Sequence, residues 1–393
     1  MVEEPMSSLL ADDAIARLLG VSAVDKSAVE EAVLVSSGAL PERARTALAE
    51  SGLKGLADAV LLEGQFGPGH FALSGSRRLY YRVRPALPGR ARALLRRVVV
   101  SGAKDDPPLR WPVEDRFVSF AEQVHAVLEK TGSARPLPWW PSGRSFAITL
   151  THDVEGPYGV SHLPDLLALE RERGFRSSVS FVGAAYQVPS SLLDDLRTDG
   201  FEIALHGWRH DGTLFASRGA FEQALPSMNR RLRQWASVGF RSPMTHRNPL
   251  WMQGLDIKWD SSFFDSDPFE PIPGGVMTIW PFVMGRFVEL PYTLPQDHAL
   301  IETLGESTPA IWIRKLDFIA AHGGMALLNS HPDYLCRSGR LTMYAEFLDE
   351  IAGRSGYWHA LPRDVASWTL KRWGGDLGTW DGKVAERLAL AQS

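Results

Sequence analysis

The sequence predicts an α/β protein whose strands form a parallel sheet, arranged either as a barrel or as a doubly wound sheet. Beyond residue 143, short apolar runs alternate with segments of helical spacing, and this order is typical of parallel strands joined by crossover helices. The first apolar run, residues 146–151 (FAITLT), is nearly continuous, as expected of a strand buried on both faces. The first 140 residues lack this alternation, and we expect them to form a mainly helical α+β region.

The N-terminal region is predicted to hold several helices and one strand-forming stretch. Leu and Ala recur at helical spacing, with a break at residues 36–38 (SSG). Residues 71–84 (FALSGSRRLYYRVR) are predicted to form one or two strands. The predicted helices cover residues 8–20, 41–62, 90–100 and 114–131.

A Pro-rich connector, residues 134–143 (ARPLPWWPSG), predicts the boundary between an N-terminal region, 1–140, and a second domain, 144–393. The second domain then follows the alternating pattern. Its predicted strands are residues 146–151, 177–182 and 201–205, and its predicted helices are residues 162–173, 190–199 and 220–237.

Composition excludes several classes of protein. Of 393 residues, 45% are hydrophobic and 22% charged, which is ordinary for a globular protein and excludes a disordered chain or a coiled coil. The net charge of −4 counts against a nucleic-acid partner. The single cysteine, Cys336, excludes an internal disulfide. Because the N-terminus carries acids where a signal peptide needs positive charge, and no apolar run reaches about 18 residues, we expect a cytoplasmic protein without a membrane span.

The first candidate motif, residues 151–156 (THDVEG), directly follows a predicted strand. In barrels of this class the chemistry lies at the carboxyl ends of the strands. Asp153 and Glu155 are two residues apart, so in an extended segment both project to the same side. One carboxylate can then hold a cation while the other accepts a proton. The alternative is a loop-capping Asp beside a solvated Glu.

Two histidines, His206 and His210 in the motif HGWRH, follow the predicted strand at residues 201–205. At a spacing of four on a helical turn they share one face and can bind one divalent cation. Arg241 (GFRSP) and His331 (LLNSHP) follow further apolar segments. Beside a carboxylate, the arginine would keep its pKa low, and beside a metal the histidine would donate a proton to a leaving group. The alternatives are structural histidines and a surface arginine.

In this order the motifs resemble those of the polysaccharide deacetylase family (carbohydrate esterase family 4). The resemblance covers residues 145–372, and residues 259–262 (WDSS) and 358–367 resemble its fourth motif and its closing segment. It implies a distorted (β/α) barrel of about seven strands with a divalent metal. It also implies that His206 and His210 bind this metal, that Arg241 holds the catalytic base and that His331 is the general acid.

The first motif departs from the family's usual Thr-Phe-Asp-Asp-Gly. Some branches of the family have an Asp-Val-Asp or Asp-Val-Glu spacing, and the resemblance to these implies that Asp153 is the base and Glu155 the third metal ligand. The reverse assignment stays open, with Asp153 on the metal and His152 or Glu155 assisting.

The function implied is metal-dependent hydrolysis of an N-acetyl group, or in second place an O-acetyl group, on an amino-sugar glycan or glycan precursor of envelope or exopolysaccharide synthesis. His and carboxylate ligands suit zinc, but also Co, Mn or Ni. Because a related branch opens cyclic amides without a metal, a metal-independent hydrolase of cyclic amide C–N bonds is an alternative. A catalytically silent carbohydrate-binding barrel is another.

Two further stretches are candidates for ligand contact. Residues 248–294 are rich in Trp, Phe, Pro and Gly, and either line a sugar site or pack a small core of their own. Residues 77–97 hold eight Arg and no acid, and either form a solvated helix face or bind a phosphate or an anionic lipid headgroup, which would place the protein at a membrane surface. The sequence predicts no oligomeric state. The candidate substrate contacts are Trp208, Trp259, Asp297 and His298, with His246 and Arg247 beside them.

Overall fold

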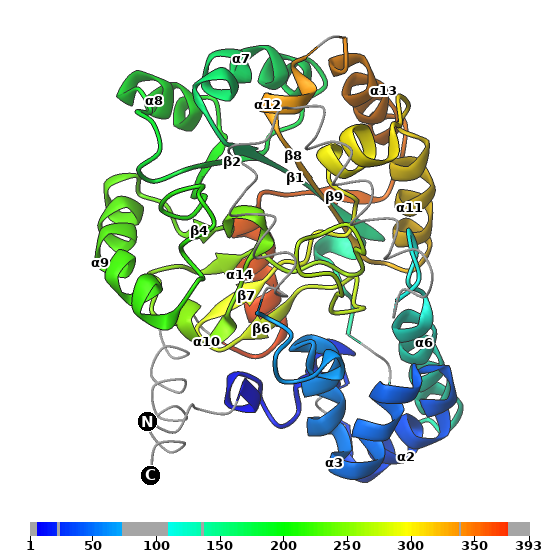
Figure 1. Ribbon diagram of the computed structural model, residues 1–393. Coiled ribbons are helices and arrows are strands. Elements are labelled where there is room, and N and C mark those ends of the chain that lie inside the picture. Colours follow the sequence, from blue (N-terminus) through cyan, green and yellow to red (C-terminus); the bar gives the residue numbers. More distant parts are fainter. Residues whose placement is uncertain (1–5, 22–23, 73–108, 135–136, 338, 376–393) are drawn as a thin grey trace.

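A curled mixed sheet of nine strands forms the centre of the protein (Figure 1), in a computed structural model that describes residues 6–21, 24–72, 109–134, 137–337 and 339–375. The strand order is β6-β7-β5-β4-β3-β2-β1-β8, and β9 pairs with β1. The strands are β1 (Phe146–Val154), β2 (Ser178–Phe181), β3 (Glu202–Leu205), β4 (Gly239–Phe240), β5 (Trp259–Asp260), β6 (Phe282–Met284), β7 (Phe287–Glu289), β8 (Met325–Ser330) and β9 (Tyr357–His359).

The sheet has the parallel core that the sequence predicts. Among the nine strands of the described residues, only β6 and β7 pair in an antiparallel manner. Without β6 and β9, the other seven strands form one parallel path. Beyond β7 the chain reaches the opposite edge of the sheet, where Leu294 forms a parallel bridge with Leu328 of β8. The sheet therefore curls into a distorted barrel, and the predicted fold class is confirmed.

Helices surround this sheet (Figure 1). Because they cover its outer side while side chains fill the barrel, all nine residues of β1 are buried. Pro157 stands in the first turn of α7, where a missing N–H costs no hydrogen bond. The helices are α7 (Pro157–Glu172), α8 (Ser190–Thr198), α9 (Arg218–Gln234), α10 (Pro249–Met252), α11 (Ala310–Ala321), α12 (Pro332–Leu335), α13 (Leu341–Ala352) and α14 (Pro362–Arg372).

The described part of the N-terminal region is helical, as predicted. The predicted helices 41–62 and 114–131 correspond to α3 and α6, whereas the segment 8–20 is broken into two short elements. The basic stretch 77–97, the helix predicted at 90–100 and all but the first two residues of the stretch 71–84 lie outside the described residues. The elements are η1 (Met6–Leu9), α1 (Ala14–Leu18), α2 (Lys26–Ser36), η2 (Ser37–Ala39), α3 (Glu42–Leu61), η3 (Gly64–Phe66) and α6 (Arg116–Lys130).

One hydrophobic core runs across the predicted boundary between the two regions. At the connector, Trp139 stacks on Trp280 with ring centroids 4.4 Å apart, and the indole N–H groups of Trp140 and Trp280 both donate to the carbonyl of Gly323. On the barrel side, Arg372 donates to the carbonyl of Arg17. The N-terminal helices are therefore packed firmly on the barrel, and the division at 140/144 stays a prediction.

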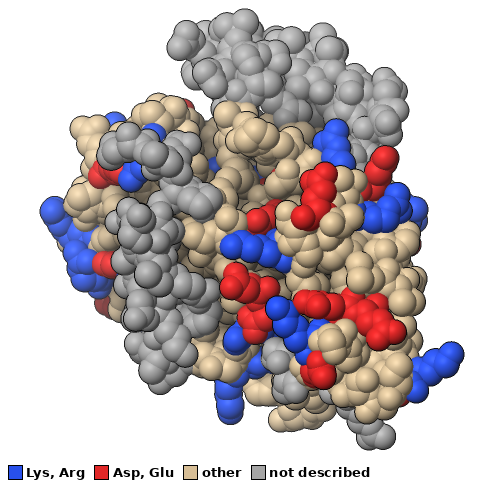
Figure 2. All heavy atoms as spheres, turned by 90° about the horizontal axis from the view of Figure 1, so that it is seen from below, with Lys and Arg blue, Asp and Glu red and all other residues tan. Residues whose placement is uncertain are grey.

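The aromatic-rich segment 248–294 is part of the interior. Most of its large apolar side chains are buried, and they belong to the one hydrophobic core of the molecule rather than to a separate small core. On the face that Figure 2 shows, acidic and basic side chains are interspersed over the described surface. Across the described ranges, no helix is both long and apolar enough to cross a membrane.

Candidate active site and metal centre

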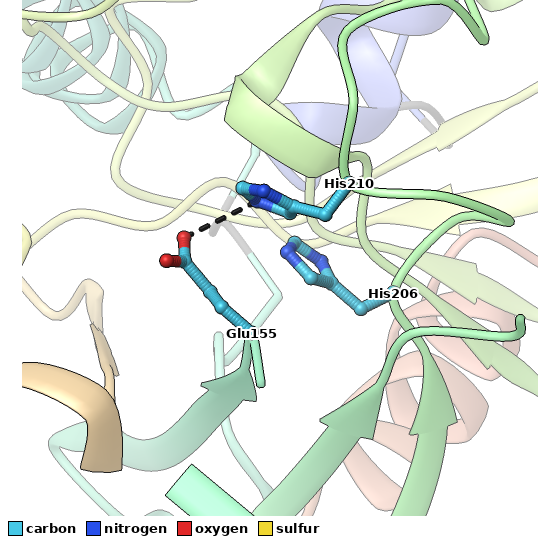
Figure 3. Close-up of side chains that lie close together, drawn as sticks. All are labelled: Glu155, His206 and His210. Carbon is cyan, nitrogen blue, oxygen red and sulfur yellow. Dashed lines mark ion pairs between the residues drawn. The ribbon is translucent and has the colours of Figure 1, made fainter. Parts of the chain in front are cut away.

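Four strand ends bring the predicted site residues together. The chain continues from β3 into His206, from β4 into Arg241 and from β8 into His331. Strand β1 carries Asp153 near its end and continues into Glu155. Because parallel strands end at one edge of the barrel, these side chains converge there. Ligand atoms of Glu155, His206 and His210 all lie within 4.8 Å of one another (Figure 3).

The alternation along β1 decides which of its side chains face this cluster. His152 points the other way, with Nε2 2.7 Å from Glu170 Oε1 and Nδ1 2.8 Å from Ser330 Oγ, and all three residues are buried. The arrangement in which His152 assists at the metal therefore has no geometric support. Asp153 and Glu155 face the cluster, as the spacing predicts.

The helical turn predicted for the two histidines is wrong. Residues 206–210 follow an irregular path, and Gly207 adopts the left-handed conformation with φ +62°. A Cβ on Gly207 would lie 2.4 Å from Cγ of Pro243, so the close approach also requires glycine. The loop still brings the two imidazoles together, with ring centroids 5.2 Å apart.

The nitrogens of these histidines suit a cation. Nδ1 of His206 lies 3.2 Å from the carbonyl oxygen of Arg241, and a proton donated there leaves Nε2 with its lone pair. Nε2 of His206 is buried without a hydrogen-bond partner among the described residues, and Nε2 of His210 is buried against Glu155. Glu155 Oε1 lies 3.2 Å from Nε2 of His210. Two imidazole nitrogens and one carboxylate oxygen are a donor set found in catalytic zinc sites, so these residues fit a divalent cation.

The protonation states agree with this assignment for His206. Burial lowers its pKa to about 4, so it is neutral at neutral pH, as a ligand must be. Burial lowers the pKa of His210 as well, but the contact with Glu155 outweighs burial and the net shift is upward. Burial raises the pKa of Glu155, but His210 outweighs this effect and the pKa falls well below its usual range. The raised pKa of His210 and the lowered pKa of Glu155 both favour an ion pair between these two residues.

Asp153 is a buried, ionised hydrogen-bond acceptor. Its Oδ2 accepts a hydrogen bond of 2.9 Å from Asn329 Nδ2, and its Oδ1 lies 3.5 Å from Arg241 Nε. Burial raises the pKa of Asp153, but His206 and Arg241 outweigh burial and the net shift is downward. Arg241 is held by hydrogen bonds from Nη2 to Thr151 Oγ1 and Ser261 Oγ, 3.0 and 2.9 Å long.

His331 approaches the cluster from the opposite side. Its Nε2 lies 3.9 Å from Asp153 Oδ2 and 4.0 Å from Glu155 Oε1. Behind it, Asp297 Oδ1 is 2.6 Å from Nδ1, and Oδ2 accepts from the His331 backbone N–H. Burial lowers the pKa of His331, but Asp297 outweighs burial and raises it to about 9. Asp297 is fully buried and contacts His331, so the structure gives no geometric support to its prediction as a substrate contact.

The other predicted substrate contacts lie in different settings. Trp259 is fully buried and its indole N–H donates to Glu202, so the structure does not bring it into the site. Arg247 is buried as well, in an ion pair with Glu63. Trp208 is half-buried and lies between His206 and His210 in the sequence. His298 is also half-buried, and its ring centroid lies 5.4 Å from that of His331. Contact of Trp208 and His298 with substrate stays a prediction.

Sequence reasoning missed several supporting residues. Asp333 accepts hydrogen bonds from the backbone N–H groups of Glu155 and Gly159, which fixes the end of β1. Asn329 lies inside the motif LLNSHP, so its place two residues before His331 was a usable signal. Asp297, His298 and His331 form a second group whose possible metal-ligand atoms lie within 4.8 Å of one another. In this group Nδ1 of His331 and Oδ1 of Asp297 are already joined by a hydrogen bond.

No family model matches the chain, and no curated protein matches it either. Solved structures do. A protein from Mycobacterium smegmatis assigned as a polysaccharide deacetylase is 23% identical, with a TM-score of 0.49 over 60% of this chain and 93% of that one. An allantoinase is 17% identical, with a TM-score of 0.44 over 62% and 94%. A family 4 carbohydrate esterase from Streptomyces lividans, in complex with acetate, is 15% identical, with a TM-score of 0.37 over 55% and 93%. At these identities the function must be inferred from the site.

Proposed function

We propose that the protein is a metal-dependent hydrolase that removes an N-acetyl group, or in second place an O-acetyl group, from an amino-sugar glycan or its precursor. One observation supports this most strongly. A Glu–His–His group suited to a cation has a carboxylate and a histidine of raised pKa within about 4 Å of its members. Hydrolysis of an amide needs these three components in one place, because water must be activated and the departing nitrogen must be protonated.

In this proposal Glu155, His206 and His210 hold the cation, with zinc as first choice and Co, Mn or Ni compatible with the donor set. A divalent cation at such a site polarises an acyl carbonyl and lowers the pKa of water. Glu155 is assigned as ligand rather than base because it is the carboxylate that lies against His210. Asp333, through the backbone of Glu155, keeps that carboxylate in place.

Asp153 accepts the proton of the attacking water, and Arg241 beside it keeps the carboxylate ionised until it does so. His331, charged through Asp297, donates a proton to the departing nitrogen as the C–N bond breaks. Water supplies the oxygen of the carboxylate product, so acetate and a free amine are formed. Trp208 and His298 are the side chains proposed to contact the sugar. A role in envelope or exopolysaccharide synthesis, in the cytoplasm or at its membrane surface, belongs to the same proposal.

Replacing His206 with Ala tests this function. Because Nε2 of His206 has no hydrogen-bond partner among the described residues, the protein is expected to stay folded while bound metal falls below a tenth of the wild-type content. Acetate release from N-acetylated amino sugars should fall at least about 100-fold, as loss of general acid–base or metal chemistry does. Metal analysis and an acetate assay measure the two effects.

The matched control is His322→Ala, because His322 lies outside the cluster, paired with Glu122 on the surface. It should retain both metal and activity. Turnover by the His206→Ala protein at the wild-type rate would reject the proposed function.

A metal-independent hydrolase of cyclic amides remains the second candidate. The observation in its favour is the 3.2 Å contact between His210 and Glu155, which balances their charges without a cation. Hydrolysis of a cyclic amide that persists after exhaustive removal of metal by a chelator would support this second function. Loss of hydrolytic activity on chelation would instead support the metal-dependent function proposed first. Acetate release also separates the first function from a silent carbohydrate-binding barrel.

A further inference from the structure

The loop after β4 contains two consecutive residues in the left-handed conformation that are not glycine. Met244 has φ 55° and Thr245 has φ 51°, and side chains rarely adopt this conformation unless their surroundings hold them there. The loop begins directly after Arg241, the residue beside Asp153. Residues 242–247, which we call the β4 loop, therefore continue the chain directly from Arg241.

Two contacts from neighbouring segments and one contact within the loop hold the β4 loop. The backbone N–H of Ser242 donates to Ser262 Oγ at 2.9 Å. Thr245 Oγ1 donates to Glu270 Oε2 at 2.7 Å, and Arg247 Nη1 donates to the carbonyl of Thr245 at 3.0 Å. Arg247 is fully buried, so its charge needs a partner in the interior.

That partner comes from the N-terminal region. Glu63, two residues beyond the end of α3, accepts from Arg247 Nε at 3.0 Å and also from Nη2. Glu63 is itself fully buried, and its other oxygen accepts from the backbone N–H of Gly275 at 2.8 Å. A buried pair of this kind strongly disfavours removal of either partner, because the other charge is then left without compensation.

A second series of hydrogen bonds leads from the β4 loop to Asp153. Glu270, which holds Thr245, also accepts from Gln296 Nε2 at 2.7 Å. Gln296 Oε1 accepts from Asn329 Nδ2 at 2.8 Å, and the same nitrogen donates to Asp153 Oδ2 at 2.9 Å. All these side chains are buried. The carboxylates of Glu270 and Asp153 at the two ends of this series can only accept hydrogen bonds. The side-chain amides of Gln296 and Asn329 must therefore turn their NH2 groups toward these carboxylates.

We propose that the N-terminal region is part of the catalytic unit, with Glu63 as a positioning residue that acts through Arg247 and the β4 loop on Arg241 and Asp153. The part concerning catalysis rests on the proposed role of Asp153 as base. Glu63 does not contact the site itself. Its effect is to restrict the β4 loop to the one conformation that serves both Arg241 and the Glu270–Gln296–Asn329 series.

Glu63→Gln tests the link between the N-terminal region and the β4 loop, and Glu122→Gln is its control. Glu122 also joins the N-terminal region to the barrel, through His322, but lies away from the β4 loop. In Glu63→Gln, kcat for acetate release should fall at least tenfold while KM and metal content change less than twofold. Glu122→Gln should leave all three within twofold. If Glu63→Gln does not fold, Arg247→Lys keeps a buried cation while removing the bond from Nη1 to Thr245.

Gln296→Met tests the series of hydrogen bonds that leads from Glu270 to Asp153. Its matched control is Gln253→Met, because Gln253 also is buried and makes two side-chain hydrogen bonds, to Pro249 and Arg286, away from the site. Both variants should lose similar stability, but only Gln296→Met should lose kcat, again tenfold or more. Equal kcat in the two variants would overturn the proposal.

Hydrogen exchange gives a readout that does not depend on activity. Peptides that cover residues 242–247 should exchange at least tenfold faster in Glu63→Gln, or in Arg247→Lys, than in the wild-type protein, and Glu122→Gln should show no change there. Unchanged exchange would overturn the coupling whatever the activity. A wild-type protein that released no acetate would instead reject the proposed function, and the exchange result would still decide whether Glu63 controls the β4 loop.

Discussion

The histidines at the site differ in the protonation state that their surroundings favour. Burial lowers the pKa of His206 to about 4, whereas Asp297 overcomes the same effect of burial and raises that of His331 to about 9. A neutral imidazole can bind a cation and a charged one can donate a proton, so one residue type serves two roles. The difference arises mainly from Asp297 behind the His331 ring, and Glu155 and Asp153 also raise the pKa of His331.

Replacing Asp297 with Asn should therefore lower activity and change its pH dependence. A proton on His331 is lost as pH rises through its pKa, so the wild-type alkaline limb is expected near pH 9. Without the carboxylate the pKa falls and the alkaline limb should move to lower pH, with kcat at neutral pH about 10- to 100-fold lower. Rates of acetate release from pH 6 to 10 measure the shift, and an unchanged alkaline limb would contradict the role of Asp297.

Single residues also show where sequence reasoning ends. That Asp153, His206 and His331 lie close together could be predicted, because each follows an apolar run that forms a strand. The supporting role of Asp297 could not, since no strand end marks it and only the folded chain brings it 2.6 Å from His331. Trp259 is the opposite case. Its motif suggested a contact with substrate, but its side chain packs in the interior.

At the scale of elements, strands were predicted more reliably than loops. The runs at 146–151 and 201–205 correspond to β1 and β3 within a few residues, because continuous apolar runs are a strong signal of strands buried on both faces. By contrast α2 was not predicted, and its exposed Leu34 and Val35 explain this, since they disturb the separation of polar and apolar faces. The loop after β3 was expected to be helical from spacing alone, which says nothing of the left-handed Gly207.

Gly207→Ala should disturb this loop. The added methyl would overlap Pro243 and the residue would have to hold φ +62°, so we expect a loss of about 1–3 kcal/mol in the free energy of unfolding, together with weaker metal binding. Gly219→Ala is the control, because a Cβ there meets nothing within 4 Å and lies in α9. Urea unfolding and a metal titration check both; equal stability of the two variants would contradict the expected strain.

Strand β3 also carries a group that links stability to pH. Burial raises the pKa of Glu202 to about 7, whereas in the unfolded chain it stays near its ordinary value of 4.5. Between these values the folded state binds a proton that the unfolded state does not, so the contribution of Glu202 falls as pH rises from 4.5 to 7, by up to about 3 kcal/mol.

Glu202→Gln should remove this dependence. The stability difference between wild-type and variant, measured by urea unfolding at pH 5 and pH 8, isolates the group from all others that titrate. Relative to the variant, the wild-type protein should be less stable at pH 8 than at pH 5. A difference that is the same at both pH values would show that Glu202 is ionised throughout.

For the whole molecule, the barrel was predictable and the contribution of the N-terminal helices was not. The alternation of strands and helices indicates a parallel sheet, and strand ends then indicate where chemistry lies. The ion pair between Glu63 and Arg247 joins residues 184 positions apart in the chain. Neither residue stands in a motif or at a strand end, so no local pattern could have predicted the contact.

Zinc should stabilise the whole protein if its site is preformed. A ligand that binds only the folded state adds about 2.7 kcal/mol at 100 times its dissociation constant, which raises the melting temperature by several degrees. Chelation should reverse the increase, and His206→Ala should show none. Calorimetry with and without zinc measures the effect; an equal increase in His206→Ala would place the stabilising ion elsewhere.

The joint between connector and barrel has an optical consequence. Trp139 and Trp280 are stacked at 4.4 Å with their planes only 9° apart, and two indole chromophores so close and nearly parallel interact electronically. Their coupled transitions should produce a paired signal in circular dichroism that vanishes when the rings separate. Detachment of the connector could thus be followed by spectroscopy without any added label.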